Sequence, residues 1–578
     1  MADAKKDKEK RELAIDKKEA AVKRPVPKEE KEVSSAVLFK EFQEHSIAEF
    51  FKKNRQMLGY SGKIKSLTTA VHEYVTNSLD ACEEAGVLPD IWVKLERMGP
   101  DHYKLVVEDN GPGIPKKFVA KAMGTMLAGT KFHRFKQARG QQGIGASGVI
   151  MFSQITTGKP TKIVTSTGDG KVYEAKISID VKTNSAKVTD EVEHNGKMRG
   201  MRIESELKDV TYQKGDQSTD EYLRRTALVN PHTKITWIDP EGVTTVWDRA
   251  IKEIPARPRE SQPHPKGIGV DDLMSMATTT ASRTIKSMLV SELARMSSAK
   301  ADEIQKKVSF DMEKRPRDIT WNEAEEIVKA IKELTFIAPP TDMLVPIGEK
   351  NMEKALDNIL KPEFKTVLTR PAAVYRGGVP FIVEVGLAYG GKAGKEIAEG
   401  NEKEKTLMEE KQFSMEVMRF ANRVPMLFDA GTCALNLAVQ NIDWKRYGIQ
   451  EGYPMACVVN FTSVHVPYTG AGKQAVVDDE EIIKEIRLAL MDAGRRLGLY
   501  VSGIRKKEEK EAKRKQLLRY IDPISEALAI LTGKADKTIA KALRHLVEDR
   551  FEQIEDEENG GEGQDSGEAE EAGSEDSD

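Results

Sequence analysis

The chain has 578 residues, of which 32% are charged and 6% aromatic, with a formal net charge of −3 at pH 7. This length predicts roughly three or four domains. No run approaches the eighteen or so apolar residues of a membrane span, and the charged N-terminus lacks the apolar core of a signal peptide. Three widely spaced cysteines argue against a disulfide framework, so we expect a soluble cytoplasmic protein with reduced, buried thiols.

Both ends of the chain have the composition of disordered tails. Residues 1–34 are rich in Lys, Glu and Ala, and residues 551–578 contain thirteen acids and no Lys or Arg. Because the whole chain carries only −3, the part between the tails carries a net positive charge. That balance is compatible with binding to nucleic acid, although long-range charge alone does not specify it.

The stretch VHEYVTNSLDACEEAG (71–86) is predicted to be a helix with two distinct faces. Glu73, Asn77 and Asp80 are spaced i, i+4 and i+7, which places them on one face. An amide oxygen can ligate Mg²⁺, and a carboxylate can orient or deprotonate a water molecule. A solvated face with two acids explains this segment alone equally well. The residues of the separate apolar stripe are Val71, Val75, Leu79 and Cys82.

Two later stretches add glycine-rich turns. YKLVVEDNGPGIP (103–115) is predicted to be a buried strand that ends at Asp109, where a carboxylate can accept a hydrogen bond from an amine such as adenine N6. Gly111 and Gly113 permit a close backbone approach in the turn that follows. RGQQGIGASGVIMFSQ (139–154) is a glycine-rich loop that leads into a helix, and its free N–H groups suit phosphates. Such a loop alone is more often a simple turn.

Together, in this order, the three stretches resemble the ATP site of the GHKL superfamily of ATPases. The resemblance implies an α/β sandwich that binds ATP and Mg²⁺, with Glu73 as the general base, Asn77 as the metal ligand and Asp109 as the adenine contact. The residues that it assigns to the nucleotide are Asn77, Asp80, Asp109, Gly111, Gly113, Thr130, Lys131, Gly140, Gln141, Gln142, Gly143, Ile144, Gly145, Ala146 and Ser147.

The predicted ATPase domain spans residues 35–255 and is followed by a small helical domain, 256–325. The first residues of the ATPase domain resemble a strap that exchanges across a dimer, although an ordinary surface helix remains an alternative. Four prolines in 254–269 mark the junction between the two domains. The helical domain resembles a helix–two-turn–helix module with relatives in DNA-binding proteins. Its candidate phosphate contacts, each equally explained as a solvated surface position, are Lys266, Arg283, Lys286 and Arg295.

Residues 326–510 are predicted to form an α/β domain, and 511–550 a helical extension. The segment 371–391 is predicted to be a hairpin with Gly-Gly at its turn. RFANRVPMLFDAG and IDWKRYGI resemble the transducer domain of the topoisomerase VI B-subunit family. The resemblance implies that a transducer lysine, Lys445, reaches the γ-phosphate. Arg423 is the nearest rival cation, and an exposed loop lysine is the alternative for Lys445.

The resemblance implies the ATP-hydrolysing subunit of a type II (IIB) DNA topoisomerase. It also implies B–B dimerisation on ATP binding, capture of duplex DNA and an A₂B₂ assembly. We find no tyrosine in a helix–turn setting beside an acidic metal cluster, so the DNA-cleaving tyrosine is expected on a partner A subunit. The alternatives are a GHKL chaperone or mismatch-repair-like clamp, and a scaffold with an inactive ATP site.

Overall fold

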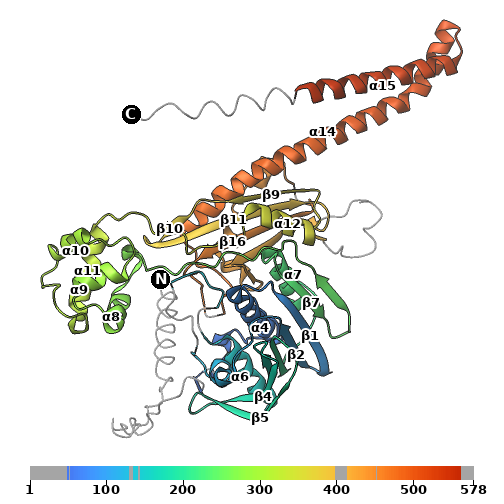
Figure 1. The fold of residues 1–578 in the computed structure, drawn as a ribbon. Helices are drawn as coiled ribbons and strands as arrows, with labels where there is room; N and C mark the ends of the chain where they lie inside the picture. The colour runs from blue at the N-terminus through green and yellow to red at the C-terminus, as the bar shows by residue number, and fades with distance from the viewer. Residues whose placement is uncertain are drawn as a thin grey trace, which may run out of the picture. The chain divides into compact units, whose positions relative to one another are not determined.

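The computed structural model describes residues 49–50, 53–128, 135–140, 143–396, 413–450, 452–470 and 472–561. The predicted N-terminal tail and most of the predicted strap lie outside these residues. The described part is a mixed α/β protein, as predicted, with two large sheets and a separate group of helices (Figure 1). Before the first sheet come η2 (Arg55–Leu58) and the long helix α4 (Lys63–Ala85).

The first sheet has eight strands in the order β5-β4-β3-β6-β2-β1-β7-β8. β1 and β7 pair in parallel, and the other neighbours pair antiparallel. The edge strand β5 was not predicted, because it is mostly exposed and lacks the apolar alternation of a half-buried strand. The strands are β1 (Asp90–Gly99), β2 (His102–Asp109), β3 (Thr161–Ser166), β4 (Lys171–Asp180), β5 (Ser185–Asn195), β6 (Gly200–Lys208), β7 (Lys234–Ile238) and β8 (Thr244–Trp247).

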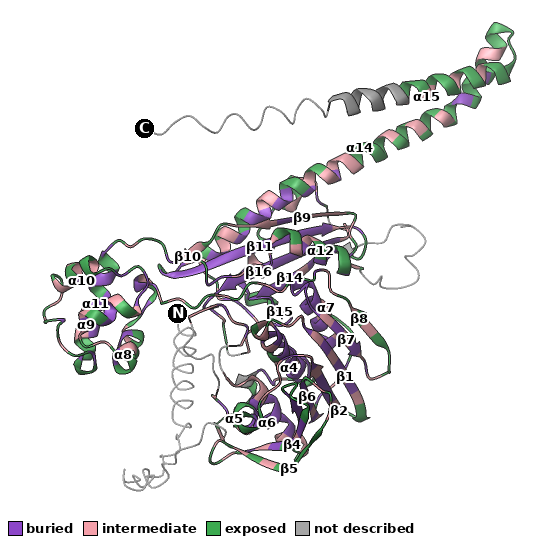
Figure 2. Cartoon of the chain, viewed as in Figure 1, coloured by how far each residue is buried: buried purple, intermediate pink, exposed green. Residues whose placement is uncertain are grey.

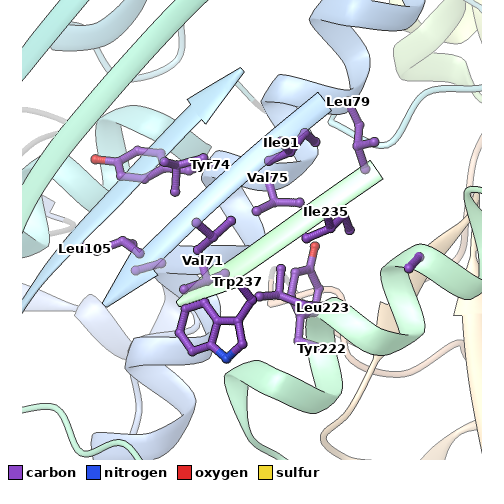
Figure 3. Packing of buried hydrophobic residues seen from close by; sticks show 14 of the residues in the cluster. Val71, Tyr74, Val75, Leu79, Ile91, Leu105, Tyr222, Leu223, Ile235 and Trp237 are labelled. Carbon is purple, nitrogen blue, oxygen red and sulfur yellow. The ribbon is translucent and has the colours of Figure 1, made fainter. Parts of the chain in front are cut away.

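Four helices accompany this sheet: α4, α5 (Lys116–Gly124), α6 (Gly145–Thr157) and α7 (Thr219–Val229). Helix α4 ends where Gly86 takes a left-handed conformation (φ 71°), which L-residues with a Cβ adopt at a cost. It contacts β2, α6 and α7. Figure 3 shows how its apolar side chains meet those of the strands and of α7 in one core.

The helical region that comes between the two sheets along the chain has its own hydrophobic core. It contains α8 (Val270–Thr279), α9 (Ile285–Glu292), α10 (Ser298–Gln305) and α11 (Trp321–Glu333), with the short helices η3 (Pro265–Gly267) and η4 (Pro316–Asp318). Two of the four candidate phosphate contacts have partners inside the chain. Lys286 pairs with Asp302 at 2.5 Å, and Arg295 donates to the carbonyl of Ala338 at 3.2 Å.

The second sheet runs β10-β11-β16-β14-β15, with β9 also paired to β11. The hairpin expected from Gly-Gly is present, since β10 and β11 pair antiparallel. The strands are β9 (Phe364–Thr369), β10 (Ala373–Tyr375), β11 (Val379–Tyr389), β14 (Glu416–Ala421), β15 (Val424–Met426) and β16 (Met455–Ser463); β12 (Lys395–Glu396) and β13 (Phe413–Ser414) form a separate pair. The other elements of this region are α12 (Glu349–Ile359), η5 (Ala430–Thr432), α13 (Ala434–Gln440) and η6 (Trp444–Tyr447).

The chain continues as α14 (Glu480–Thr532) and α15 (Asp536–Gly561). The sequence predicted a boundary between an α/β domain and a helical extension after residue 510, but α14 is one helix of 53 residues that crosses this position and includes Pro523. Its first part is buried against the second sheet and its later part is mostly exposed (Figure 2). Helix α15 contacts α14 and extends past Phe551, where we expected disorder to begin.

Candidate functional site

The polar face of α4 carries the three side chains that the sequence singled out. Glu73 is partly exposed, Asn77 is exposed and Asp80 is buried. All four residues of the apolar stripe are buried, as their spacing predicts. One side of α4 therefore fills the core while the other offers polar groups at the surface of the domain.

Two described glycines of the glycine-rich loop, Gly140 and Gly145, lie beside this polar face. A Cβ at Gly145 would overlap Oε2 of Glu73, so any larger residue there would push that carboxylate aside. A Cβ at Gly140 would lie 3.9 Å from Oδ2 of Asp80 and 4.0 Å from Oδ1 of Asn77. Helix α6 starts at Gly145, so its free N–H groups begin beside Glu73. This combination suits a phosphate group with a carboxylate close to it.

Asp109 is the last residue of β2 and is buried beside Ser78 of α4. Its Oδ2 accepts a hydrogen bond from the Ser78 hydroxyl at 2.8 Å, and its Oδ1 accepts one from the Gly111 amide at 2.9 Å. Burial raises the pKa of Asp109 above its ordinary value, although these hydrogen bonds act in the opposite direction. An ionised carboxylate has about four lone-pair sites, so Asp109 retains capacity to accept from an amine.

The turn after Asp109 requires its glycines. A Cβ at Gly111 would lie 2.9 Å from Oδ1 of Asp109, and one at Gly113 (φ 67°) would overlap the carbonyl oxygen of Ser166. Thr165, which the sequence analysis did not select, holds this turn by accepting a hydrogen bond from the Ile114 amide at 2.8 Å. It lies in an ordinary strand pattern, so no local signal distinguishes it.

The remaining residues assigned to the glycine-rich loop are only partly described. Gly143 is left-handed (φ 59°), and the Ser147 hydroxyl donates to the carbonyl of Ile144 at 3.3 Å. Ala146 packs against the hydrophobic core. The predicted nucleotide contacts that lie outside the described residues are Thr130, Lys131, Gln141 and Gln142.

Asp80 is bound to an arginine that the sequence analysis did not select. Its Oδ1 accepts a hydrogen bond from Arg139 at 2.9 Å, and both side chains are buried. Arg139 immediately precedes the glycine-rich loop. Asp80 therefore anchors the base of that loop, and its predicted contact with the nucleotide remains a prediction.

Asn77 is the predicted metal ligand, and its exposed amide lies next to Gly140. Within the described residues, no group of three or more His, Cys, Asp or Glu side chains could hold a metal ion. Mg²⁺ usually keeps several water ligands and binds few protein groups when substrate phosphates complete its shell. A single amide on α4 fits that arrangement.

A lysine from the second α/β region, Lys473, approaches this site. Its Nζ donates to the carbonyl of Arg139 at 3.4 Å, and the neighbouring Gly472 lies beside Gly59, near the start of α4. Burial lowers the pKa of His72, the neighbour of Glu73, and the charge of Lys473 lowers it further although Glu73 acts to raise it. The glycines in TGAGKQ were the sequence signal that could have identified this loop.

The predicted cation, Lys445, and its rival, Arg423, occupy different places. Lys445 is exposed in η6, which packs on α14 through Tyr447. A Cβ at Gly494 of α14 would lie 3.1 Å from the Tyr447 ring. Arg423 is buried in the β14–β15 turn and pairs with Glu83 of α4 at 3.3 Å.

Two wider expectations can also be compared with the structure. The three cysteines are free and buried, as predicted. Among the helices of the described ranges, none combines the length and apolarity that a membrane crossing requires.

Comparisons with known proteins match two regions of the chain to protein families and nearly the whole chain to individual relatives. Residues 62–181 match the family of histidine kinase-, DNA gyrase B- and HSP90-like ATPases, and residues 339–515 match the transducer family of the topoisomerase VI B subunit. The chain is 47% identical to the B subunit of type 2 DNA topoisomerase 6 from Thermococcus sibiricus, over 90% of this chain and 97% of that protein. It is 45% identical to the corresponding protein of Methanothermobacter thermautotrophicus, over 86% and 93% respectively. The chain therefore belongs to the family of type 2 DNA topoisomerase 6 B subunits.

Proposed function

We propose that this B subunit hydrolyses ATP on the polar face of α4 and uses the cycle to drive strand passage through a DNA break. The observation that supports this most directly is the glycine loop against Glu73, with Asn77 one helical turn further on. The free N–H groups at the start of α6 are suited to bind phosphate oxygens beside that carboxylate.

Each side chain of the site has a proposed part in the reaction. Glu73 orients or deprotonates the water that attacks the γ-phosphate. Asn77 would hold Mg²⁺, which neutralises charge on the phosphates when it is bound. Asp109 accepts a hydrogen bond from the amino group of adenine, because its Ser78 and Gly111 contacts leave lone pairs available.

For the cation at the γ-phosphate we propose Lys473 in place of Lys445. Phosphoryl transfer gains from a positive charge placed where negative charge is redistributed. Lys473 donates to the base of the glycine loop, whereas η6, which carries Lys445, packs on α14. A lysine in this position ties the state of the nucleotide to the position of the transducer.

We also propose the assembly in which the protein works. Its partners are a tyrosine-bearing A subunit that cuts duplex DNA and a second copy of this chain that closes when ATP binds, in an A₂B₂ heterotetramer. Sedimentation of the purified chain with and without a non-hydrolysable ATP analogue tests the B–B contact. A mass that stays monomeric in both conditions contradicts it. A chaperone or mismatch-repair-like clamp is not favoured, because the transducer region matches the topoisomerase VI family.

The substitution Glu73→Gln tests the proposed chemistry in the assembled A–B enzyme. It retains the size of the side chain and removes the base, so we expect ATP hydrolysis to fall by about 10²–10⁴-fold while ATP still binds. Glu84→Gln, which changes an exposed acid on the same helix, is the matched control. Hydrolysis at the wild-type rate in Glu73→Gln removes Glu73 from the proposed role.

A further inference from the structure

The segment just before the glycine loop is bound to the transducer region at several points. The backbone N–H of Gln137 donates to the carbonyl of Met343 at 3.3 Å, and its side-chain oxygen accepts a hydrogen bond from the backbone N–H of Val345 at 2.6 Å. The Asn422 side chain donates to the carbonyl of Ala138 at 3.1 Å. Lys473 donates to the carbonyl of Arg139, so three separate transducer segments hold residues 137–139. We call residues 137–139 the loop base.

The side chain of Arg139 binds the loop base to the ATPase region as well. It donates to Asp80, to both carboxylate oxygens of Glu83 at 2.6 and 3.0 Å, and to Asn230 at 2.6 Å. Arg139 is only 6% exposed, so these charge-assisted hydrogen bonds are made away from water. The position of the loop base therefore depends on Asp80 and Glu83.

Glu83 is shared between the two regions. Besides Arg139 it binds His232 at 2.8 Å and Arg423 of the transducer at 3.3 Å. Burial acts to raise the pKa of Glu83, but Arg139 and Arg423 outweigh it and hold that pKa well below its ordinary value. Burial keeps the pKa of His232 below its ordinary value. Two acids, Asp80 and Glu83, thus balance two arginines.

Arg423 is held firmly in its own region. It has a left-handed backbone (φ 62°), and its backbone N–H donates to Asn460 of the same region at 3.2 Å. Its carbonyl also accepts a hydrogen bond from Asn230 of the ATPase region at 3.1 Å. Asn460 in turn donates to the buried Glu384, which also accepts from the amides of residues 347 and 348 at the start of α12. The backbone of Arg423 is therefore connected to the central strands of the transducer sheet, and its guanidinium extends from there to Glu83.

Within the cluster of Asp80, Glu83, Arg139 and Arg423, the contact between Arg423 and Glu83 is weaker than the contact between Arg139 and Glu83. A single 3.3 Å contact joins them, whereas Arg139 binds Glu83 with two shorter ones. A cavity of about 250 Å³ borders the cluster and is lined by both arginines and by residues 255–258. If the transducer shifts, Arg423 has space to leave Glu83 while Arg139 still neutralises that carboxylate.

We propose that Arg423 is a positioning residue for ATP turnover: through Glu83 it fixes Arg139, so that the glycine loop is placed according to the position of the transducer. This inference rests on the proposed hydrolysis of ATP beneath that loop. It assigns to the transducer a second route to the nucleotide, separate from Lys473, that acts through the loop base and does not touch the phosphates.

The test is steady-state ATP hydrolysis by the full A–B enzyme carrying Arg423→Gln, Glu83→Gln or both. We expect each single variant to raise KM for ATP by about tenfold and to change kcat less, because the loop is no longer placed before ATP binds. In the double variant, one negative charge on Asp80 remains beside one positive charge on Arg139, so the charges of the cluster still balance. Its KM should therefore be no higher than that of either single variant, a clear departure from additivity.

Glu416→Gln is the matched control, because Glu416 pairs with Arg225 at 3.1 Å and also joins the two regions without touching the loop base. It should leave KM for ATP within about twofold of wild type. Arg423→Lys keeps the charge and should recover most of the affinity. If Arg423→Gln does not fold, the comparison of Glu83→Gln with Glu416→Gln decides the question. A wild-type KM in both Arg423 variants, an equal rise in Glu416→Gln, or additive single effects overturns the inference. Activity retained in Glu73→Gln instead overturns the proposed function and identifies which of the two has failed.

Discussion

The two ends of the proposed nucleotide site are built in different ways. At the end where adenine is proposed to bind, called the base end, Asp109, Ser78 and Gly111 all belong to the ATPase region and are joined by short hydrogen bonds. At the phosphate end, α4 and the glycine loop meet the transducer, which contributes Lys473. Only the phosphate end is therefore shared between two regions.

This difference has a mechanical consequence. A pocket that one rigid region builds alone recognises its ligand in the same way whatever the neighbouring region does. A pocket that two regions complete can respond to their relative position, because differential contacts are what shift a conformational equilibrium. We therefore expect substitutions at the base end to change binding and stability, and substitutions of groups proposed to act directly on the phosphates to change turnover.

The largest expected effect is at the base end, with Gly113→Ala. Its Cβ would overlap the carbonyl oxygen of Ser166 on a left-handed backbone, so both strain and a backbone clash oppose it. We expect the free energy of unfolding to fall by about 3–4 kcal/mol. Gly242→Ala is the control, because Gly242 is also left-handed (φ 84°) but has open space around it, and it should lose only about 1–2 kcal/mol. Chemical denaturation measures both; equal losses would show that the turn is not tightly packed.

At the phosphate end, Lys473→Ala should reduce kcat for ATP hydrolysis by about 10²-fold, because one charge on the transferring phosphate is lost. Lys445→Ala should remain within about twofold of wild type. Steady-state hydrolysis at saturating ATP compares the two variants. The reverse ranking would return the role to Lys445.

Gly145→Ala sharpens the comparison without removing any charge. The new methyl group would displace the Glu73 carboxylate, and a displacement of about 1 Å can cost up to about 10²-fold in rate. We expect kcat to fall by about 30–100-fold, with a melting temperature close to wild type. Gly431→Ala is the control, since nothing lies within 4 Å of its Cβ position. An unchanged kcat would place the loop away from Glu73 during catalysis.

The smallest expected effect is a pH dependence of binding at the base end. Burial raises the pKa of Asp109, so its carboxylate gains a proton at a higher pH than an ordinary aspartate. The ionised form accepts the adenine hydrogen bond, so affinity is complete above this raised pKa and declines as pH falls through it. The folded state itself is not destabilised by that protonation, because a raised carboxyl pKa favours the protonated folded form. Adenosine, which carries no phosphate, should bind a few-fold more weakly in acid by calorimetry; pH-independent binding would exclude Asp109 as the acceptor.

Local patterns in the sequence determined much of this site. The spacing of Glu73, Asn77 and Asp80 follows from the geometry of a single helix, and the glycines beside Asp109 follow from the geometry of a single turn. The apolar stripe of α4 is buried as its period requires. These features depend on neighbours within a few residues along the chain, so a sequence read in order contains them.

Other features depend on the tertiary structure. Glu83 meets Arg423, and the carbonyl of Arg139 meets Lys473, because two regions far apart in the sequence contact each other in the fold. An arginine or lysine in a loop has the same local pattern whether it is solvated or buried against a distant carboxylate, so the sequence alone does not decide between Lys445 and Lys473. The helical period and capping of one segment determine its own face, but which charges from other segments that face meets is decided by packing.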